Sequence, residues 1–202
     1  MADNGTIKSR LVDVDDSMLV VIDVQDCFLQ KYDDSTSQDL VSRVVWLLKV
    51  ATSLEVPVIA MAEDIGHSGG LTSRVQEALP EGIVVHDKDA FGLADNAGIL
   101  AAVGACGRKT AVLVGTETDV CVSQSAIGLM NRGYEVVVVS DAVATTDGDG
   151  YIGLSRMSEA GAAVCSVKSL YYEWLRSVSS TRRLEKLAPE LEGRLLPDSL
   201  VL

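Results

Sequence analysis

Three side chains in this sequence have the chemistry of a nucleophile and its helpers. Cys121 follows an apolar run and the polar turn GTETD, where a helix is expected to begin. The unpaired amides and dipole of a helix start stabilise a thiolate, so we expect its pKa to lie below about 8.5. Asp23 and Lys88 each follow another apolar run. A carboxylate can take the thiol proton and return it to a leaving amine, and an ammonium stabilises the thiolate.

Each of these residues also has a plainer interpretation. A lone cysteine often serves as a small buried hydrophobic residue. A carboxylate at the end of a strand is often a loop or capping group, and most lysines are solvated. The residue types alone therefore leave both a catalytic and a structural interpretation open.

Apolar, β-branched runs alternate with helical patterns along the chain. The runs predict strands at 18–23, 56–62, 82–86, 110–115, 134–142 and 161–167. The helical patterns occupy roughly 38–53, 70–79, 94–106, 121–132, 151–160 and 168–177. Nearly continuous apolar strands are typical of a parallel sheet covered on both faces. We therefore expect a three-layer α/β/α sandwich with a mostly parallel six-stranded sheet, whose sites form at the carboxyl ends of the strands.

The bulk composition limits the class of protein. The 202 residues suit one domain, with a core at about 17–177 and a tail, 178–202, that packs on the body or on a neighbouring subunit. The net charge of −12 argues against a nucleic-acid partner. No apolar run approaches a membrane span, and the N-terminal stretch lacks the apolar region of a secretory signal. We expect a cytoplasmic protein whose four cysteines are free thiols.

Three segments together resemble the isochorismatase-like cysteine hydrolase superfamily, which includes nicotinamidases and N-carbamoylsarcosine amidases. They are VVIDVQDCF (20–28), KDAFG (88–92) and VGTETDVCVSQSAIGLMNRGYEVVVVSDAVAT (114–145). The third is the most specific, because a G-x-x-T-x-x-C-V run is followed by a helix and a V-x-x-D-A strand end.

The resemblance implies a role for each matching residue. Asp23 falls on the general base of the family, Lys88 on its lysine and Cys121 on its nucleophile. It also implies a cis peptide bond between Thr116 and Glu117. The amides of Glu117 and Cys121 would then form the oxyanion hole.

The segment MAEDIGHSGG departs from the nicotinamidase pattern. Nicotinamidases of this superfamily bind a metal through a D-x-H motif and a further histidine. Here Glu63, Asp64 and His67 lack that spacing, and His86 is the only other histidine. We therefore predict no metal and no cofactor, with a metal-assisted nicotinamidase as the alternative.

A thiol at Cys121 favours attack on a carbonyl carbon. Isochorismatases proper cleave a vinyl ether without a cysteine at this position. We therefore predict hydrolysis of a C–N bond in a small amide or ureido compound, through a thioester that water, activated by Asp23, then cleaves. Phe28 and Phe91 either line a pocket for a planar substrate or pack in the core.

Two interpretations of another class remain. A low-pKa thiol is also oxidisable, which would suit a redox-active thiol protein. The second interpretation is a binding subunit without catalytic activity. Relatives are frequently oligomers, so we expect a homo-oligomer, either a dimer or a tetramer.

Overall fold

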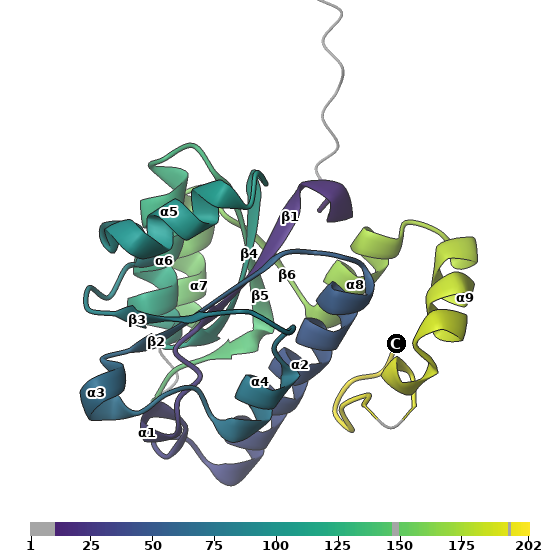
Figure 1. Cartoon of the computed structure of the whole chain (residues 1–202), viewed down its shortest axis with the longest axis horizontal. Helices are drawn as coiled ribbons and strands as arrows, with labels where there is room; N and C mark the ends of the chain where they lie inside the picture. The colour runs from purple at the N-terminus through teal and green to yellow at the C-terminus, as the bar shows by residue number, and fades with distance from the viewer. Residues whose placement is uncertain (1–10, 147–149, 194) are drawn as a thin grey trace, which may run out of the picture.

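The fold is built on one sheet whose strands all run in the same direction. A computed structural model describes residues 11–146, 150–193 and 195–202 (Figure 1). In these ranges the strands are β1 (Ser17–Ile22), β2 (Val58–Glu63), β3 (Val85–Lys88), β4 (Thr110–Thr116), β5 (Glu135–Ala144) and β6 (Ala163–Cys165). They lie in the order β3-β2-β1-β4-β5-β6, and every neighbouring pair is parallel. The predicted three-layer α/β fold is confirmed, with a sheet that is wholly rather than mostly parallel.

Helices cover both faces of the sheet (Figure 1). The longer ones are α2 (Asp34–Ser53), α4 (Ser73–Ala78), α5 (Ala97–Ala105), α6 (Ser123–Met130), α7 (Gly150–Glu159), α8 (Val167–Leu175) and α9 (Val178–Leu187). Short helices are α1 (Asp26–Leu29) and α3 (Ile65–Ser68), with 3-10 turns at Val14–Asp16, Leu93–Asp95 and Pro189–Leu191. No helix in the part of the chain described here is both long and apolar enough to span a membrane.

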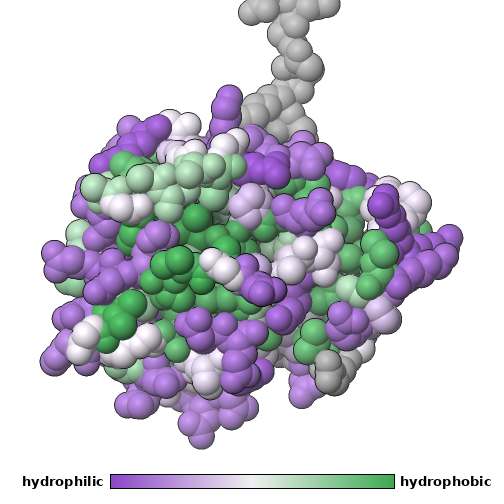
Figure 2. All heavy atoms as spheres, viewed as in Figure 1, coloured by the Kyte–Doolittle hydropathy of each residue, from purple (hydrophilic) through white to green (hydrophobic). Residues whose placement is uncertain are grey.

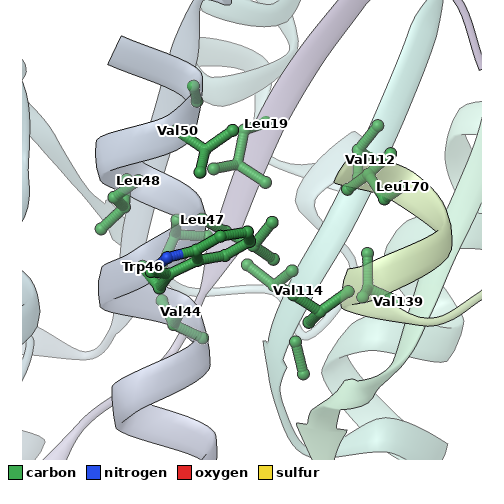
Figure 3. Packing of buried hydrophobic residues seen from close by; sticks show 14 of the residues in the cluster. Leu19, Val44, Trp46, Leu47, Leu48, Val50, Val112, Val114, Val139 and Leu170 are labelled. Carbon is green, nitrogen blue, oxygen red and sulfur yellow. The ribbon is translucent and has the colours of Figure 1, made fainter. Parts of the chain in front are cut away.

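Alternate residues of each central strand face two separate apolar layers. In β1, Leu19 and Val21 pack with α2, α4 and α8, whereas Met18 and Val20 pack with α5, α6 and α7. Figure 3 shows the first layer, in which side chains of α2, β1, β4, β5 and α8 meet. Because both faces are covered, the inner strands are apolar at successive positions, which explains their continuous runs in the sequence.

The C-terminal segment packs on the body and contains a helix that the sequence pattern does not predict. Helix α9 and the following turn contribute Leu184 and Leu191 to the layer around α2. The buried Trp46 indole of α2 donates a hydrogen bond of 2.7 Å to the Leu191 carbonyl. The Tyr171 ring lies tilted against Trp46, with ring centroids 5.1 Å apart, and its hydroxyl donates to Glu192 over 2.9 Å. Of the two alternatives that the sequence left open for this tail, the structure shows packing on the body.

Strands β1 and β4 approach each other closely at Gly115. This residue pairs with Ile22 and has a φ of 124°, a backbone conformation that residues other than glycine rarely adopt. A Cβ at Gly115 would lie 1.9 Å from the Ile22 carbonyl oxygen. The glycine therefore lets the ends of the two strands, and the residues that follow them, lie side by side.

We predict that Gly115→Ala lowers the free energy of unfolding by about 2–5 kcal/mol, since it adds left-handed strain to a steric overlap. Urea denaturation followed by tryptophan fluorescence measures the change. Gly70→Ala is the control, because its Cβ meets open space, and it should stay within about 0.5 kcal/mol of the parent. Equal stability of the two variants would contradict the close approach.

Candidate active site

Four polar side chains meet at the carboxyl ends of β1, β2, β3 and β4. Asp23 follows β1, Glu63 ends β2, Lys88 ends β3, and Cys121 follows β4. Parallel strands place their carboxyl ends at one edge of the sheet, so residues distant in sequence become neighbours there. The structure brings together the three residues Asp23, Lys88 and Cys121, and adds Glu63.

Asp23 is held by its main chain at the end of β1. Its φ is 50°, a left-handed conformation that aspartate tolerates better than most residues. Its amide donates to the Met61 carbonyl of β2 at 3.1 Å, and its carbonyl accepts from the Gln25 amide at 2.8 Å. The Thr116 hydroxyl donates to the same carbonyl at 2.5 Å. These bonds tie Asp23 to both neighbouring strands while its side chain, which is 0% exposed, faces the site.

Lys88 provides a buried positive charge at the centre of the group. It is 0% exposed, and its Nζ lies 3.0 Å from Asp23 Oδ2 and 3.2 Å from Glu63 Oε2. The ammonium also donates to the Ala90 carbonyl at 3.2 Å and lies 3.7 Å from Cys121 Sγ. A buried charge is costly unless it is paired, and these contacts supply that pairing.

Glu63 is a site residue to which the sequence assigns no role. The register of β2 and β3 pairs it directly with Lys88. Its Oε2 accepts a hydrogen bond from Cys121 Sγ over 3.3 Å. Gln25, fully buried, accepts from the Glu63 amide at 2.7 Å and donates to its carbonyl at 2.9 Å. The signal in the sequence is only that a carboxylate ends the second strand. The contact of this carboxylate with Lys88 depends on the register of β2 and β3.

Cys121 lies within the first turn of a helix that begins earlier than predicted. The residues Thr118–Val122 form a π-helical turn, in which the Val122 amide donates to the Glu117 carbonyl at 3.1 Å, and α6 continues from it. The helix expected at 121 therefore begins at Thr118. The peptide bond between Thr116 and Glu117, just before this turn, is cis.

Neighbouring elements pack tightly on the turn that carries Cys121. Asp119 Oδ1 accepts a hydrogen bond of 2.6 Å from the Thr145 hydroxyl, which follows β5. A Cβ at Gly153 of α7 would lie 2.9 Å from Asp119 Cα, so the backbones are in direct contact. These contacts fix the position of the Cys121 thiol. Cys121 is only 2% exposed.

The ionisation of Asp23 and Lys88 is strongly coupled. Burial raises the pKa of Asp23 from 3.8 to about 6, although the Lys88 ammonium opposes this rise. Burial also disfavours the charged form of Lys88, but the Asp23 carboxylate outweighs it, so the pKa of Lys88 is raised. At neutral pH the pair is a carboxylate and an ammonium.

The pKa of Cys121 does not follow the expectation from its place at a helix start. Burial raises the pKa of the thiol well above 9.0, the Asp23 carboxylate raises it further, and Lys88 opposes both. The helix start is outweighed because two carboxylates face one ammonium, so a thiolate would add another negative charge to a dry site. The expectation of a lowered pKa is therefore wrong, and the resting group is a thiol.

The two phenylalanines lie in different environments. Phe28 of α1 is buried, and Lys31 Nζ lies 4.6 Å from its ring centroid and 3.4 Å from Glu117 Oε1. Phe91 is 52% exposed, with its ring centroid 6.0 Å from Lys88 Nζ. Phe91 is thus the aromatic residue beside Lys88 and open to solvent, whereas Phe28 is buried and belongs to neither apolar layer.

The donor atoms of the site are arranged around an ammonium rather than a metal ion. Asp23, Glu63 and Cys121 each offer one ligand atom, all within 4.8 Å of one another. Lys88 Nζ lies within 3.7 Å of the side chains of all three. Neither His67 nor His86 belongs to this group, and zinc sites usually have three or more protein ligands around an open centre. The set does not fit the metal site of nicotinamidases.

A cavity lined by described residues lies away from this chemistry. It has a volume of about 710 Å³ and borders the amino ends of β4 and β5, with Thr110 and Glu135 in its wall. Because Cys121 lies beyond the carboxyl end of β4, this cavity does not serve it. Of the four side chains at the site, Glu63 is the most exposed, at 19%, whereas Asp23 and Lys88 are fully buried.

We predict that Asp23→Asn and Lys88→Met shift the pKa of Cys121 in opposite directions. Removing the carboxylate lowers it and removing the ammonium raises it, and each unit changes the thiolate fraction about tenfold. Iodoacetamide alkylation over a neutral to alkaline pH series, read by peptide mapping, measures both. Cys106, a partly exposed thiol, serves as the internal control. Shifts in the same direction would show that these charges do not govern the thiol.

Several known proteins are similar to this chain in sequence. A model of the isochorismatase domain matches residues 17–169. The secreted isochorismatase effector Isc1 of Phytophthora sojae is 31% identical over 131 residues, which are 63% of this chain and 62% of that protein. Isochorismatase family protein 1A of Dictyostelium discoideum is 26% identical over 89% of each chain.

A solved structure shows the same fold. The YcaC gene product of Escherichia coli, described as an octameric hydrolase of unknown specificity, superposes with a TM-score of 0.80. The two are 23% identical, and the match covers 94% of this chain and 97% of that one. The domain match spans most of the chain and includes all four strand ends of the site. The chain therefore belongs to the isochorismatase family of hydrolases.

Proposed function

We propose that this protein hydrolyses a C–N bond of a small amide or ureido compound through a thioester on Cys121. The observation that carries the proposal is the position of one buried thiol beside an ammonium that is itself paired with the Asp23 carboxylate. Lys88 Nζ lies 3.0 Å from Asp23 Oδ2 and 3.7 Å from Cys121 Sγ. Such a group supplies a nucleophile, a base and a fixed positive charge.

Acylation begins with proton transfer from Cys121 to Asp23. The thiol is neutral at rest, so deprotonation accompanies attack of sulfur on the carbonyl carbon. Asp23 is suited to this step, because its pKa of about 6 leaves it ionised at neutral pH yet basic enough to accept a proton. The S–C bond forms, the C–N bond breaks, and Asp23 returns the proton to the leaving amine.

The amides of Glu117 and Cys121 form the oxyanion hole in this proposal. Both belong to the tight turn after β4, where the backbone is held by Thr145 and α7. Rigid amides aimed at a developing oxyanion stabilise it without reorganisation. Support for a polar ligand comes from Asp23 Oδ1 and Thr118 Oγ1, buried atoms that have no hydrogen-bond partner among the described residues.

The redox alternative is less well supported. A peroxide-sensing thiol is accessible and has a low pKa. Cys121 is buried and the pKa of its thiol is raised. The idle binding subunit is also less well supported, because Asp23 and Lys88 form an ion pair that contacts the thiol.

The proposal predicts turnover of at least one compound in a panel of small primary amides, ureido compounds and nicotinamide, read as ammonia or amine release. Cys121→Ala and Asp23→Asn should each lower kcat/KM by at least about 10³-fold, whereas Cys106→Ala should not change it.

In the parent, kcat/KM should rise with pH to a plateau above about 6, as Asp23 ionises. Including nicotinamide with and without a chelator tests the metal-assisted alternative. Full activity of Cys121→Ala would exclude a thioester.

We also propose that the chain forms a homo-oligomer through α5. This helix has the sequence AGILAAVGA and carries no polar side chain, although Ala97, Ala101 and Ala105 are exposed. Figure 2 shows apolar surface over this helix. A wholly apolar helix is typical of a buried position, so a second copy would cover it. The YcaC neighbour is octameric, which is larger than the dimer or tetramer expected from sequence.

Light scattering after size-exclusion chromatography tests this assembly. We predict that the parent is larger than a monomer and that Ala101→Arg shifts it to a smaller species, because a charge cannot be buried at a closely packed helix contact. Ser179→Arg on α9, also an exposed position, is the control and should leave the mass unchanged. A monomeric parent would contradict the proposal.

A further inference from the structure

We infer that Glu63 is the general base for hydrolysis of the thioester and that it returns a proton to Cys121 Sγ. This inference rests on the proposed thioester. It divides the work between two carboxylates, with Asp23 acting in acylation and Glu63 in deacylation. It replaces the expectation from sequence that Asp23 activates the water.

In the resting structure Glu63 already contacts the sulfur to which it would return a proton. Cys121 Sγ donates to Glu63 Oε2 over 3.3 Å, and Lys88 Nζ donates to the same oxygen over 3.2 Å. The other oxygen, Oε1, has no hydrogen-bond partner among the residues that the structure describes. One carboxylate oxygen therefore faces the sulfur, and the second is available to a water molecule.

The two carboxylates differ in their access to water. Asp23 is 0% exposed, whereas the side chain of Glu63 is 19% exposed. The hydrolytic water comes from solvent, so it meets Glu63 before it can reach Asp23. Asp23 also faces Lys88 at 3.0 Å from inside the site. A water held by Glu63 Oε1 would thus stand on the open side of an acylated sulfur.

The proton balance closes with Glu63 and without another reagent. After acylation, Asp23 has given its proton to the departed amine and is again ionised. Water attacks the thioester carbon, its O–C bond forms, and one proton passes to Glu63. The C–S bond then breaks with its electron pair on sulfur, and Glu63 gives that proton to Sγ. The acid product leaves, and the thiol bonded to Glu63 in the resting structure is restored.

Gln25 holds Glu63 in the position that this role requires. Its side chain bonds both the amide and the carbonyl of Glu63, at 2.7 and 2.9 Å. It also donates to the Gly69 carbonyl at 2.7 Å, which ties the loop after α3 to the end of β2. Gln25 is 0% exposed and acts here as a positioning residue.

The experiment uses p-nitrophenyl acetate, because its acetyl thioester can be followed without a known substrate. In the parent, p-nitrophenolate should appear as a burst followed by slower turnover, with acetyl on Cys121 by peptide mass spectrometry. Glu63→Gln should keep the burst rate, lower the steady rate by about 10²–10⁴-fold and accumulate acetylated Cys121. Asp23→Asn should instead lose the burst. Asp64→Asn, which removes the adjacent carboxylate, is the matched control and should behave as the parent.

A second measurement separates a chemical role from a structural one. Hydroxylamine attacks a thioester without needing a base, so it should release the acetyl group from Glu63→Gln as fast as from the parent. If Glu63→Gln slows the burst and the steady rate equally, or hydroxylamine does not restore release, the inference is wrong while the thioester stands. If the parent itself forms no acetylated Cys121, the proposed function fails.

Discussion

The pairing of the buried Lys88 ammonium with two carboxylates is the interaction on which the rest of the site depends. A charge removed from water costs several kcal/mol unless its partners are close and well oriented. Asp23 and Glu63 meet that requirement from the ends of two other strands, at 3.0 and 3.2 Å. The ends of β1, β2 and β3 must therefore stay in register, or the lysine loses its partners.

The same pairing explains why the thiol is neutral at rest. Two carboxylates and one ammonium leave a net negative charge beside Cys121, and burial adds to the cost of a thiolate. A site of this kind does not store a reactive anion. In the mechanism that we propose, the nucleophile forms only while a carbonyl carbon is being attacked, when the negative charge moves from sulfur toward the substrate oxygen. The buried, protonated thiol is thereby kept from side reactions with oxidants.

The scaffold supplies rigidity at the places where the site residues leave it. Asp23, Glu63, Lys88 and the turn before Cys121 all stand at strand ends, and the strands behind them are packed on both faces. Gly115 allows β1 and β4 to approach, and Gly153 allows α7 to touch the turn that carries Cys121. The C-terminal segment closes one apolar layer through Trp46 and Tyr171. Most of the structure thus serves to hold four short chain segments in fixed relation.

The sequence by itself determined the fold class, the six longer helices before the tail to within a few residues, and three of the four residues that meet at the site. It did so because apolar runs covered on both faces, helical periodicity and the motif around Cys121 are local signals. Helix α9 was missed because its pattern is mostly polar, with Leu184 its only buried residue. The contact of Glu63 with Lys88 was missed because it depends on the pairing of β2 with β3, and register is not local. Only the tertiary structure decided the protonation state of the thiol, since burial and neighbouring charges, contributed by distant segments, outweigh the helix start that the sequence displays.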